Sequence, residues 1–133
     1  MTKRRLTVWL VAALVGAFTF ATPAQAATCE LTFTPNFRGM YGTQYMWQVD
    51  ARFRNIGTTP STNWEAIIGF AYSQGAAVKQ FWNITRPSTY VWNPASWNKV
   101  LPAGQSAYFG FEILVPTATL SPLPTAVGCN ITY

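Results

Sequence analysis

The chain has 133 residues, half of them hydrophobic and 16% aromatic, with a formal net charge of +5 and no histidine. Beyond residue 5 its basic residues are scattered and form no dense patch that could face phosphates, so nucleic-acid binding is not expected. Without histidine there is no Ser–His or Cys–His triad, and two cysteines alone do not complete a metal shell, so neither a metal nor another cofactor is expected.

The first 26 residues have the order of a secretory signal peptide. A basic start at residues 3–5 precedes an apolar run over residues 6–21, and the small-residue site "AQA" follows at 24–26. The apolar run is too short for a comfortable membrane span and no second one follows, so we expect export without a membrane anchor. Cleavage after residue 26 would leave one domain, residues 27–133, with six basic and four acidic residues.

Two cysteines, Cys29 and Cys129, lie near the two ends of the predicted mature chain. In an oxidising compartment an even number of cysteines favours pairing. On the chain-entropy model, a bridge closing a loop of about 100 residues would contribute about 4–5 kcal/mol of stability. It would also bring the two termini side by side.

Glycine and proline interrupt the mature chain every eight to fifteen residues, and no helical pattern appears, which favours an all-β sandwich or barrel. The clearest strand is 45–56, where one set of alternate positions is apolar and the other is mostly polar. The first set is Tyr45, Trp47, Val49, Ala51 and Phe53, and the second is Met46, Gln48, Asp50, Arg52 and Arg54.

Further strands are predicted over 64–72, 76–84, 89–93 and 107–115, and a Pro-rich stretch then leads to the closing "GCNITY". Several strands supply core residues, so the chain is expected to fold as a monomer. In the strand 107–115 one face carries Ala107, Phe109, Phe111, Ile113 and Val115, and the other carries Tyr108, Gly110, Glu112 and Leu114.

The five tryptophans of the mature chain differ in their expected environment. Trp47 and Trp64 are in phase with apolar neighbours and are predicted to lie in the core. The strand period alone leaves Trp82 ambiguous, and Trp97 lies outside any regular strand, which leaves its burial open. Trp92 is out of phase with the apolar residue before it, which predicts an outward ring.

An exposed tryptophan on a secreted protein needs a partner, because exposed apolar surface invites aggregation. The flat face of a β-linked glucan is one natural partner. Burying about 100 Å² per ring would contribute roughly 2–3 kcal/mol. One ring alone would bind weakly, whereas two or three coplanar rings on a rigid sheet, with polar side chains around them, would suffice.

Several motifs occur together in a fairly specific order: an early cysteine, "N-x-G-x-x-x" at residues 55–60, the internal Trp64, "SQGAAVKQFWN", "VWNPASWN" and "LPAGQSAYFGF". In these motifs the chain resembles a family 2 carbohydrate-binding module, the bacterial cellulose- and chitin-binding β-sandwich. The resemblance covers nearly the whole mature chain. It implies a two-sheet antiparallel, jelly-roll-like β-sandwich with a disulfide joining its ends.

The resemblance also implies a ligand-binding set. Trp82 and Trp97 match two of three surface rings that lie in a line on one sheet face, which favours exposure of Trp82 through a local bulge. The family's first ring falls at Thr43, and either Tyr41 or Tyr45 could substitute for it. Trp92 replaces a small polar residue and would add an aromatic contact. Polar contacts to the glycan are implied for Gln80, Asp50, Tyr108 and Glu112.

Three functions are compatible with these features. The leading hypothesis is a secreted, stand-alone, non-catalytic module that binds a polysaccharide such as cellulose, chitin or xylan. A second is an adhesin or effector that contacts proteins through its aromatic face, favoured by the altered first ring and by Trp92. A small glycosidase is the least favoured, because its two facing carboxylates are not evident among the four acidic residues, Glu30, Asp50, Glu65 and Glu112.

Overall fold

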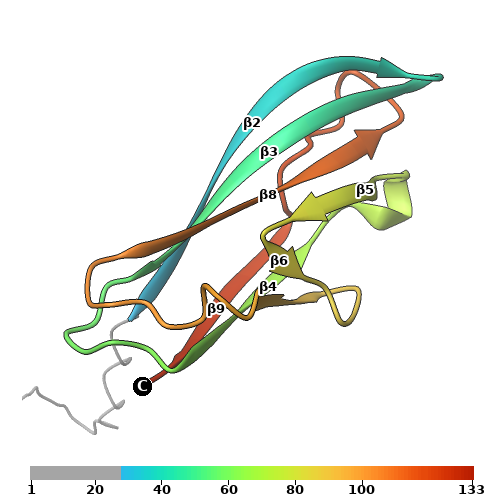
Figure 1. Ribbon diagram of the computed structural model, residues 1–133. Helices are drawn as coiled ribbons and strands as arrows, with labels where there is room; N and C mark the ends of the chain where they lie inside the picture. Colours follow the sequence, from blue (N-terminus) through green and yellow to red (C-terminus); the bar gives the residue numbers. More distant parts are fainter. Residues whose placement is uncertain (1–27) are drawn as a thin grey trace, which may run out of the picture.

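The computed structural model describes residues 28–133, so the predicted signal peptide and its cleavage site lie outside the described residues. Two four-stranded antiparallel sheets face each other (Figure 1), as predicted. The first sheet has the order β2 (Cys29–Tyr41), β3 (Gln44–Asn55), β8 (Ser106–Val115), β5 (Ala77–Trp82). The second has the order β6 (Ile84–Thr85), β7 (Val91–Pro94), β4 (Asn63–Gly69), β9 (Ala126–Thr132). No helix within residues 28–133 is long and apolar enough to cross a bilayer.

The core lies between the two sheets and is built from the alternate positions that the sequence singles out. In the β3–β8 ladder Val49 pairs with Phe111 and Ala51 with Phe109, and all four side chains are buried. Directly paired residues of two antiparallel strands have their side chains on the same face of the sheet. This register therefore places the residues that alternate with the buried ones, on both strands, on the outer face.

Trp64 lies in the core, as predicted. Its ring stacks on Phe53 at 4.2 Å, and its indole Nε1 donates a hydrogen bond to the backbone oxygen of Asn98 at 2.9 Å. Trp47, also predicted to be core, is only partly buried and packs against the edge of the core near Phe37. The hydrogen bond to Asn98 gives the buried indole nitrogen of Trp64 the acceptor that a buried tryptophan requires.

Strand β2 is absent from the predicted strands, although it is the longest in the described chain. It forms one edge of the first sheet, where it pairs with β3 along its whole length apart from an irregularity between Phe37 and Gly39. A two-residue loop joins the two strands, and Gly42 takes its first central position with φ 62°, which is the conformation that such hairpin loops demand.

Two predicted strands are shorter than expected. The strand predicted over 64–72 ends at Gly69 and is followed by a short 3₁₀ turn, Tyr72–Gln74. The strand predicted over 76–84 is divided at Asn83, whose φ of 60° is left-handed and cannot continue a strand. This break separates β5 in the first sheet from β6 in the second, so the chain changes sheets there.

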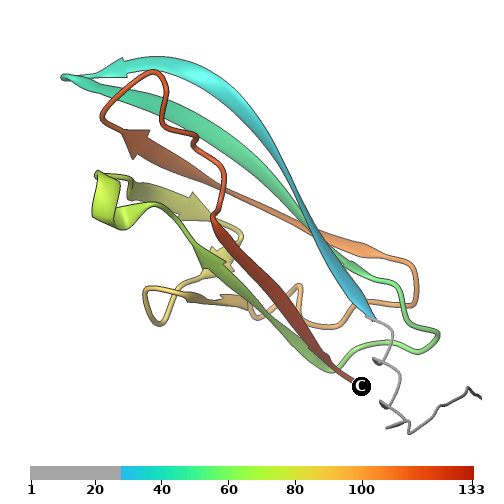
Figure 2. The same ribbon diagram turned by 180° about the vertical axis from the view of Figure 1, so that it is seen from behind.

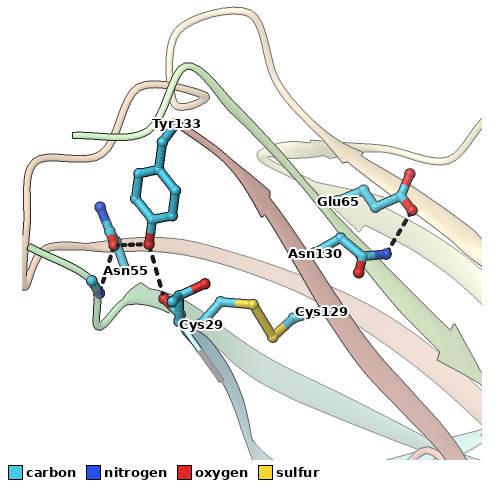
Figure 3. The surroundings of a disulfide bond; sticks show 8 residues. Cys29, Asn55, Glu65, Cys129, Asn130 and Tyr133 are labelled. Carbon is cyan, nitrogen blue, oxygen red and sulfur yellow. Dashed lines mark hydrogen bonds between the residues drawn. A yellow bond between two sulfur atoms is a disulfide. The ribbon is translucent and has the colours of Figure 1, made fainter. Parts of the chain in front are cut away.

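A disulfide joins Cys29 of β2 to Cys129 of β9, with the two Cα atoms 6.2 Å apart (Figure 3). The bond links the two sheets and fixes both ends of the described chain at the same end of the sandwich, which confirms the predicted pairing. Seen from behind, β4 and β9 lie side by side and run in opposite directions, with β9 leading to the C-terminus (Figure 2).

Asn55 explains the "N-x-G" motif. Its side chain is completely buried, and its Nδ2 donates to the backbone oxygens of Thr59 and Leu101, both at 2.9 Å. Its Oδ1 accepts from the backbone nitrogen of Gly57 and from the Tyr133 hydroxyl, also at 2.9 Å (Figure 3). A buried amide with every partner in place fixes one conformation of the turn after β3.

Candidate functional site

The outer face of the first sheet carries Trp82 and is called the Trp82 face below. On β5, Val78 pairs with Ile113 whereas Gln80 pairs with Glu112, so one extra residue, Lys79, lies between them. Such a bulge reverses the side on which the following residues lie. Trp82 therefore lies on the same face as its partner Gly110, on the solvent side of the sheet.

The indole of Trp82 covers the backbone of Gly110. A Cβ atom added at Gly110 would lie 2.5 Å from Trp82 Cζ2 and 2.6 Å from Cε2. The ring thus occupies the space above β8 that a side chain would otherwise fill. This contact makes Trp82 half-buried and fixes the ring against a rigid strand.

Replacing Gly110 with alanine is therefore expected to push the Trp82 ring off the sheet. We expect a loss of about 1–3 kcal/mol in the free energy of unfolding, which is the usual cost of overpacking. Urea denaturation measures the loss, and nuclear Overhauser contacts between the indole and β8 report the displacement. The matched control is Gly128→Ala, because a Cβ there would lie 3.5 Å from its nearest neighbour, an ordinary contact. Equal stability losses in both variants would contradict this account.

Trp97 is the most exposed large apolar side chain of the described residues, at 69%. It lies in the loop after β7, and the next residue, Asn98, anchors that loop. The Asn98 side chain donates to the backbone oxygen of Asn83 at 3.0 Å, and its backbone oxygen holds the indole of Trp64. The loop of Trp97 is therefore tied to the residue that follows Trp82.

Tyr108 lies on the same face and is 65% exposed. Two shallow hollows flank it, and both are also lined by Asp50. One, of about 350 Å³, extends to Trp82 and Asn83, and the other, of about 240 Å³, extends to Arg52, Thr32 and Thr34. The arrangement is an open aromatic surface with shallow room beside each ring, and it is not a deep pocket.

Three acidic residues lie on the Trp82 face: Glu30, which pairs with Arg52 and Arg54, and Asp50 and Glu112, each of which is held by side-chain amides. Asp50 accepts from Gln48 Nε2 at 3.1 Å and from Asn36 Nδ2 at 3.4 Å. Glu112 Oε1 accepts from Gln80 Nε2 at 2.7 Å and lies 3.3 Å from Lys79 Nζ. A row of amides and carboxylates therefore follows the rings and offers both donors and acceptors to a hydroxylated ligand.

The structure separates the two candidates for a further ring. Lys79 Nζ, which contacts Glu112 on the Trp82 face, also lies 4.8 Å from the centroid of the Tyr41 ring. Tyr41 thus belongs to this face. Tyr45 instead pairs with the buried Val115 and contacts Phe37 with its ring centroid at 6.1 Å, so it lies on the inner side of the hairpin.

The prediction that Trp92 points outward is wrong. Trp92 is 0% exposed and lies between the sheets, with its ring centroid 5.4 Å from that of Phe111 and 5.7 Å from that of Phe81. The physical reason is that Val91 pairs with Ile67 on the outer face of β4, so the apolar valine faces outward and the tryptophan faces inward. Trp92 is therefore not available as a ligand-binding ring.

Several residues of the Trp82 face are missing from the predicted site, among them Asn36, Gln48 and Lys79, which contact its two amide-held carboxylates. Gln48 lies in the polar set of the strand 45–56 and could have been found from that alternation. Asn36 could not, because β2 is absent from the predicted strands, and Lys79 reaches the face only through the bulge.

Within residues 28–133 no cluster of three or more potential metal ligands occurs.

Comparison with known proteins gives a consistent result. The sequence profile described as cellulose binding domain matches residues 29–131. Endoglucanase B of Cellvibrio japonicus (strain Ueda107) is 29% identical over 101 residues, which cover 74% of this chain but only 18% of that protein. The chain therefore spans less than a fifth of the length of this curated relative.

Solved structures share the fold. The chitin-binding domain of Chi18aC from Streptomyces coelicolor matches with a TM-score of 0.52 and 25% identity, over 79% of this chain and 92% of that one. The chitin-binding domain of a hyperthermophilic chitinase from Pyrococcus furiosus matches with a TM-score of 0.52 and 24% identity, over 83% of this chain and 93% of that one.

Proposed function

The chain belongs to the cellulose binding domain family and is a non-catalytic carbohydrate-binding module, and from that premise we propose that its Trp82 face binds the surface of an insoluble β-linked polysaccharide, cellulose or chitin. The observation that carries the proposal is the pair Trp82 and Trp97. One ring is fixed on the backbone of Gly110, and the other is exposed on a loop tied to the next residue of the chain. A flat sugar ring stacks on such surfaces through its axial C–H groups.

The remaining residues of the Trp82 face have complementary roles. Tyr108 and Tyr41 extend the aromatic surface on which further sugar rings stack. Gln80, Asp50 and Glu112 contact sugar hydroxyls, with the amide donating and the carboxylates accepting hydrogen bonds. Because their own partners already orient these side chains, little rotational freedom is lost when a ligand binds.

The choice between cellulose and chitin belongs to the same proposal. The curated relative is an endoglucanase, and the similar solved domains are described as chitin-binding. The hollows beside Tyr108 offer room for a substituent on the sugar ring, such as the acetamido group of chitin. Chitin is therefore the first ligand to test, followed by cellulose and xylan.

An adhesin-like contact with a protein is the weaker alternative. One of the two features that favoured it was an outward Trp92, and that ring is buried.

Export of the module is also part of the proposal, because a protein that binds an insoluble polysaccharide must reach it. Mass spectrometry of the protein released into the medium tests this, with cleavage after Ala26 as the expected result.

Depletion from solution by an insoluble polysaccharide tests the proposed function. We expect most of the protein to sediment with chitin or cellulose and less with xylan. Since the contact is stacking by uncharged rings, 1 M NaCl should change the bound fraction by less than about twofold, whereas a charge-driven contact would be screened. No depletion by any of the three polysaccharides, or release by salt, would refute the proposal.

A further inference from the structure

A second aromatic ring covers a glycine on the opposite side of the sandwich. Tyr90 is 51% exposed, and a Cβ atom added at Gly69 would lie 2.6 Å from Tyr90 Cε1. Gly69 ends β4 and pairs with Ala126 of β9. The Cβ atom added at Gly69 would lie 3.4 Å from the Cβ atom of Ala126. The ring therefore lies on the outer face of the second sheet, called the Tyr90 face below.

This arrangement repeats that of Trp82 on Gly110. In both cases the ring covers a strand backbone that has no side chain, so one side of the ring is supported and the other is free. In both cases the supporting glycine is itself buried. The Tyr90 ring is held further by Tyr72, whose centroid is 5.8 Å away in an edge-to-face arrangement, and by the hydrogen bond from Ile68 N to Tyr90 O.

The Tyr90 face is flat beside the ring and polar beyond it. Ala126 and Gly128 of β9 have a small side chain or none, so the surface next to Tyr90 is low. Ile67 of β4, the central strand, lies between Gly128 of β9 and Val91 of β7. Farther along the same strands, Asn130 Nδ2 donates to Glu65 Oε2 at 3.0 Å (Figure 3). The second carboxylate oxygen of Glu65 and the single side-chain oxygen of Asn130 are left to accept hydrogen bonds.

The charge of this face indicates its ligand class. Of the described residues whose side chains lie on the outer faces of β4, β7 and β9, Glu65 alone is charged, and it is bonded to a neutral amide. Arg86 lies beside Tyr72, but its Nη2 already donates to the Tyr72 hydroxyl and to the Thr89 backbone oxygen. Such a face complements an uncharged hydroxylated molecule, and these strands hold no cluster of cations for phosphates or acidic peptides. A second protein copy fits poorly as well, since a stable interface buries about 800 Å² per partner and the large apolar side chains here are few.

We propose that the Tyr90 face is a second, weaker binding site for a β-linked glycan chain, with Tyr90 as the stacking ring and Glu65 and Asn130 as hydrogen-bonding partners. The proposal takes its ligand class from the proposed function and adds a separate site. One ring gives weak binding alone. Once the Trp82 face is bound, however, a neighbouring chain is present at high effective concentration, so the module links two glycan chains from opposite sides.

An amide chemical-shift titration tests this site in isolation. The probes are soluble chitohexaose and cellohexaose, and the protein is the Trp82→Ala, Trp97→Ala variant. We expect saturable shifts at Gly69, Ala126 and Gly128 with at least one probe. Adding Tyr90→Ala should weaken this binding at least fivefold, whereas Tyr90→Phe, which keeps the ring, should stay within twofold. If the alanine variant does not fold, the phenylalanine variant and the parent titration still decide.

The outcomes separate the two proposals. Shifts around Trp82 in the unmodified protein, with none around Gly69 in either protein, would overturn the second site and leave the proposed function standing. Shifts in neither region with both probes, together with no depletion by insoluble polysaccharide, would overturn both. Shifts around Gly69 that survive Tyr90→Ala unchanged would show that Tyr90 is not the binding ring, and the second site as proposed would fail.

Discussion

A protein in which Trp82 and Trp97 are both replaced by alanine is expected to remain in solution when mixed with the polysaccharide that depletes the unmodified protein. Each ring would bury about 100 Å² of apolar area against sugar, worth roughly 2–3 kcal/mol before ordering costs. Allowing for those costs, and for the side of Trp82 already covered by Gly110, we expect at least about 100-fold weaker binding. Binding isotherms on the insoluble polysaccharide measure this change.

The fold of that variant should be unaffected, because neither ring belongs to the core between the sheets. A matched control is Phe37→Ala, which removes an exposed aromatic ring that lies near Trp47 and Tyr45, away from the Trp82 face. The control should bind within about twofold of the parent protein. Unchanged depletion by the double variant would contradict the assignment of the Trp82 face, provided that circular dichroism shows both variants folded.

Replacing Cys29 and Cys129 with alanine should give the largest loss of stability. The disulfide spans a sequence separation of 100 residues. Its removal is expected to lower the free energy of unfolding by about 4–5 kcal/mol. For a domain of this size that corresponds to a fall in Tm of roughly 20–30 °C. Calorimetry of the parent, the double variant and the parent reduced with dithiothreitol measures it.

The reduced parent serves as the control, because it removes the covalent bond while both sulfur atoms stay in place. Agreement between the reduced parent and the variant would assign the loss to the cross-link. A fall in Tm of less than about 5 °C in both would show that strand pairing alone holds β2 and β9. Below its Tm the variant should still bind polysaccharide, since neither cysteine lies on the Trp82 face.

The regular alternation of apolar and polar residues predicted most of the strands. The strands around Val49 and Phe111 alternate over many residues, so their phase was predicted correctly. Alternation alone left a sandwich and a barrel open, and the family resemblance indicated the two-sheet arrangement. Strand β2 has the same alternation, but Pro35 interrupts it. Proline is tolerated in β2 because that strand is a sheet edge, a property that depends on the complete sheet and not on the local sequence.

The site was less predictable because its residues depend on contacts between strands. The exposure of Trp82 depends on the extra residue Lys79 in β5, and only the family resemblance indicated that bulge. Trp92 was misassigned because β7 has four residues, too few to establish a phase, and its valine faces outward. Tyr90 was not singled out at all, because its position is defined by a glycine 21 residues earlier in the chain.

The place of the disulfide has a mechanical consequence for the proposed attachment of the Trp82 face to a solid polysaccharide. A force that pulls on the C-terminal end enters through β9, whose ladder with β4 from Asn63↔Thr132 to Gly69↔Ala126 runs along the long axis of the sandwich (Figure 2). Cys129 lies near the pulled end and transfers the tension directly to Cys29 of β2. Strand β2 belongs to the sheet that carries Trp82, so the tension passes through the disulfide into that sheet, whose strands are then pulled in shear. The second sheet therefore need not unfold before the force reaches the Trp82 face.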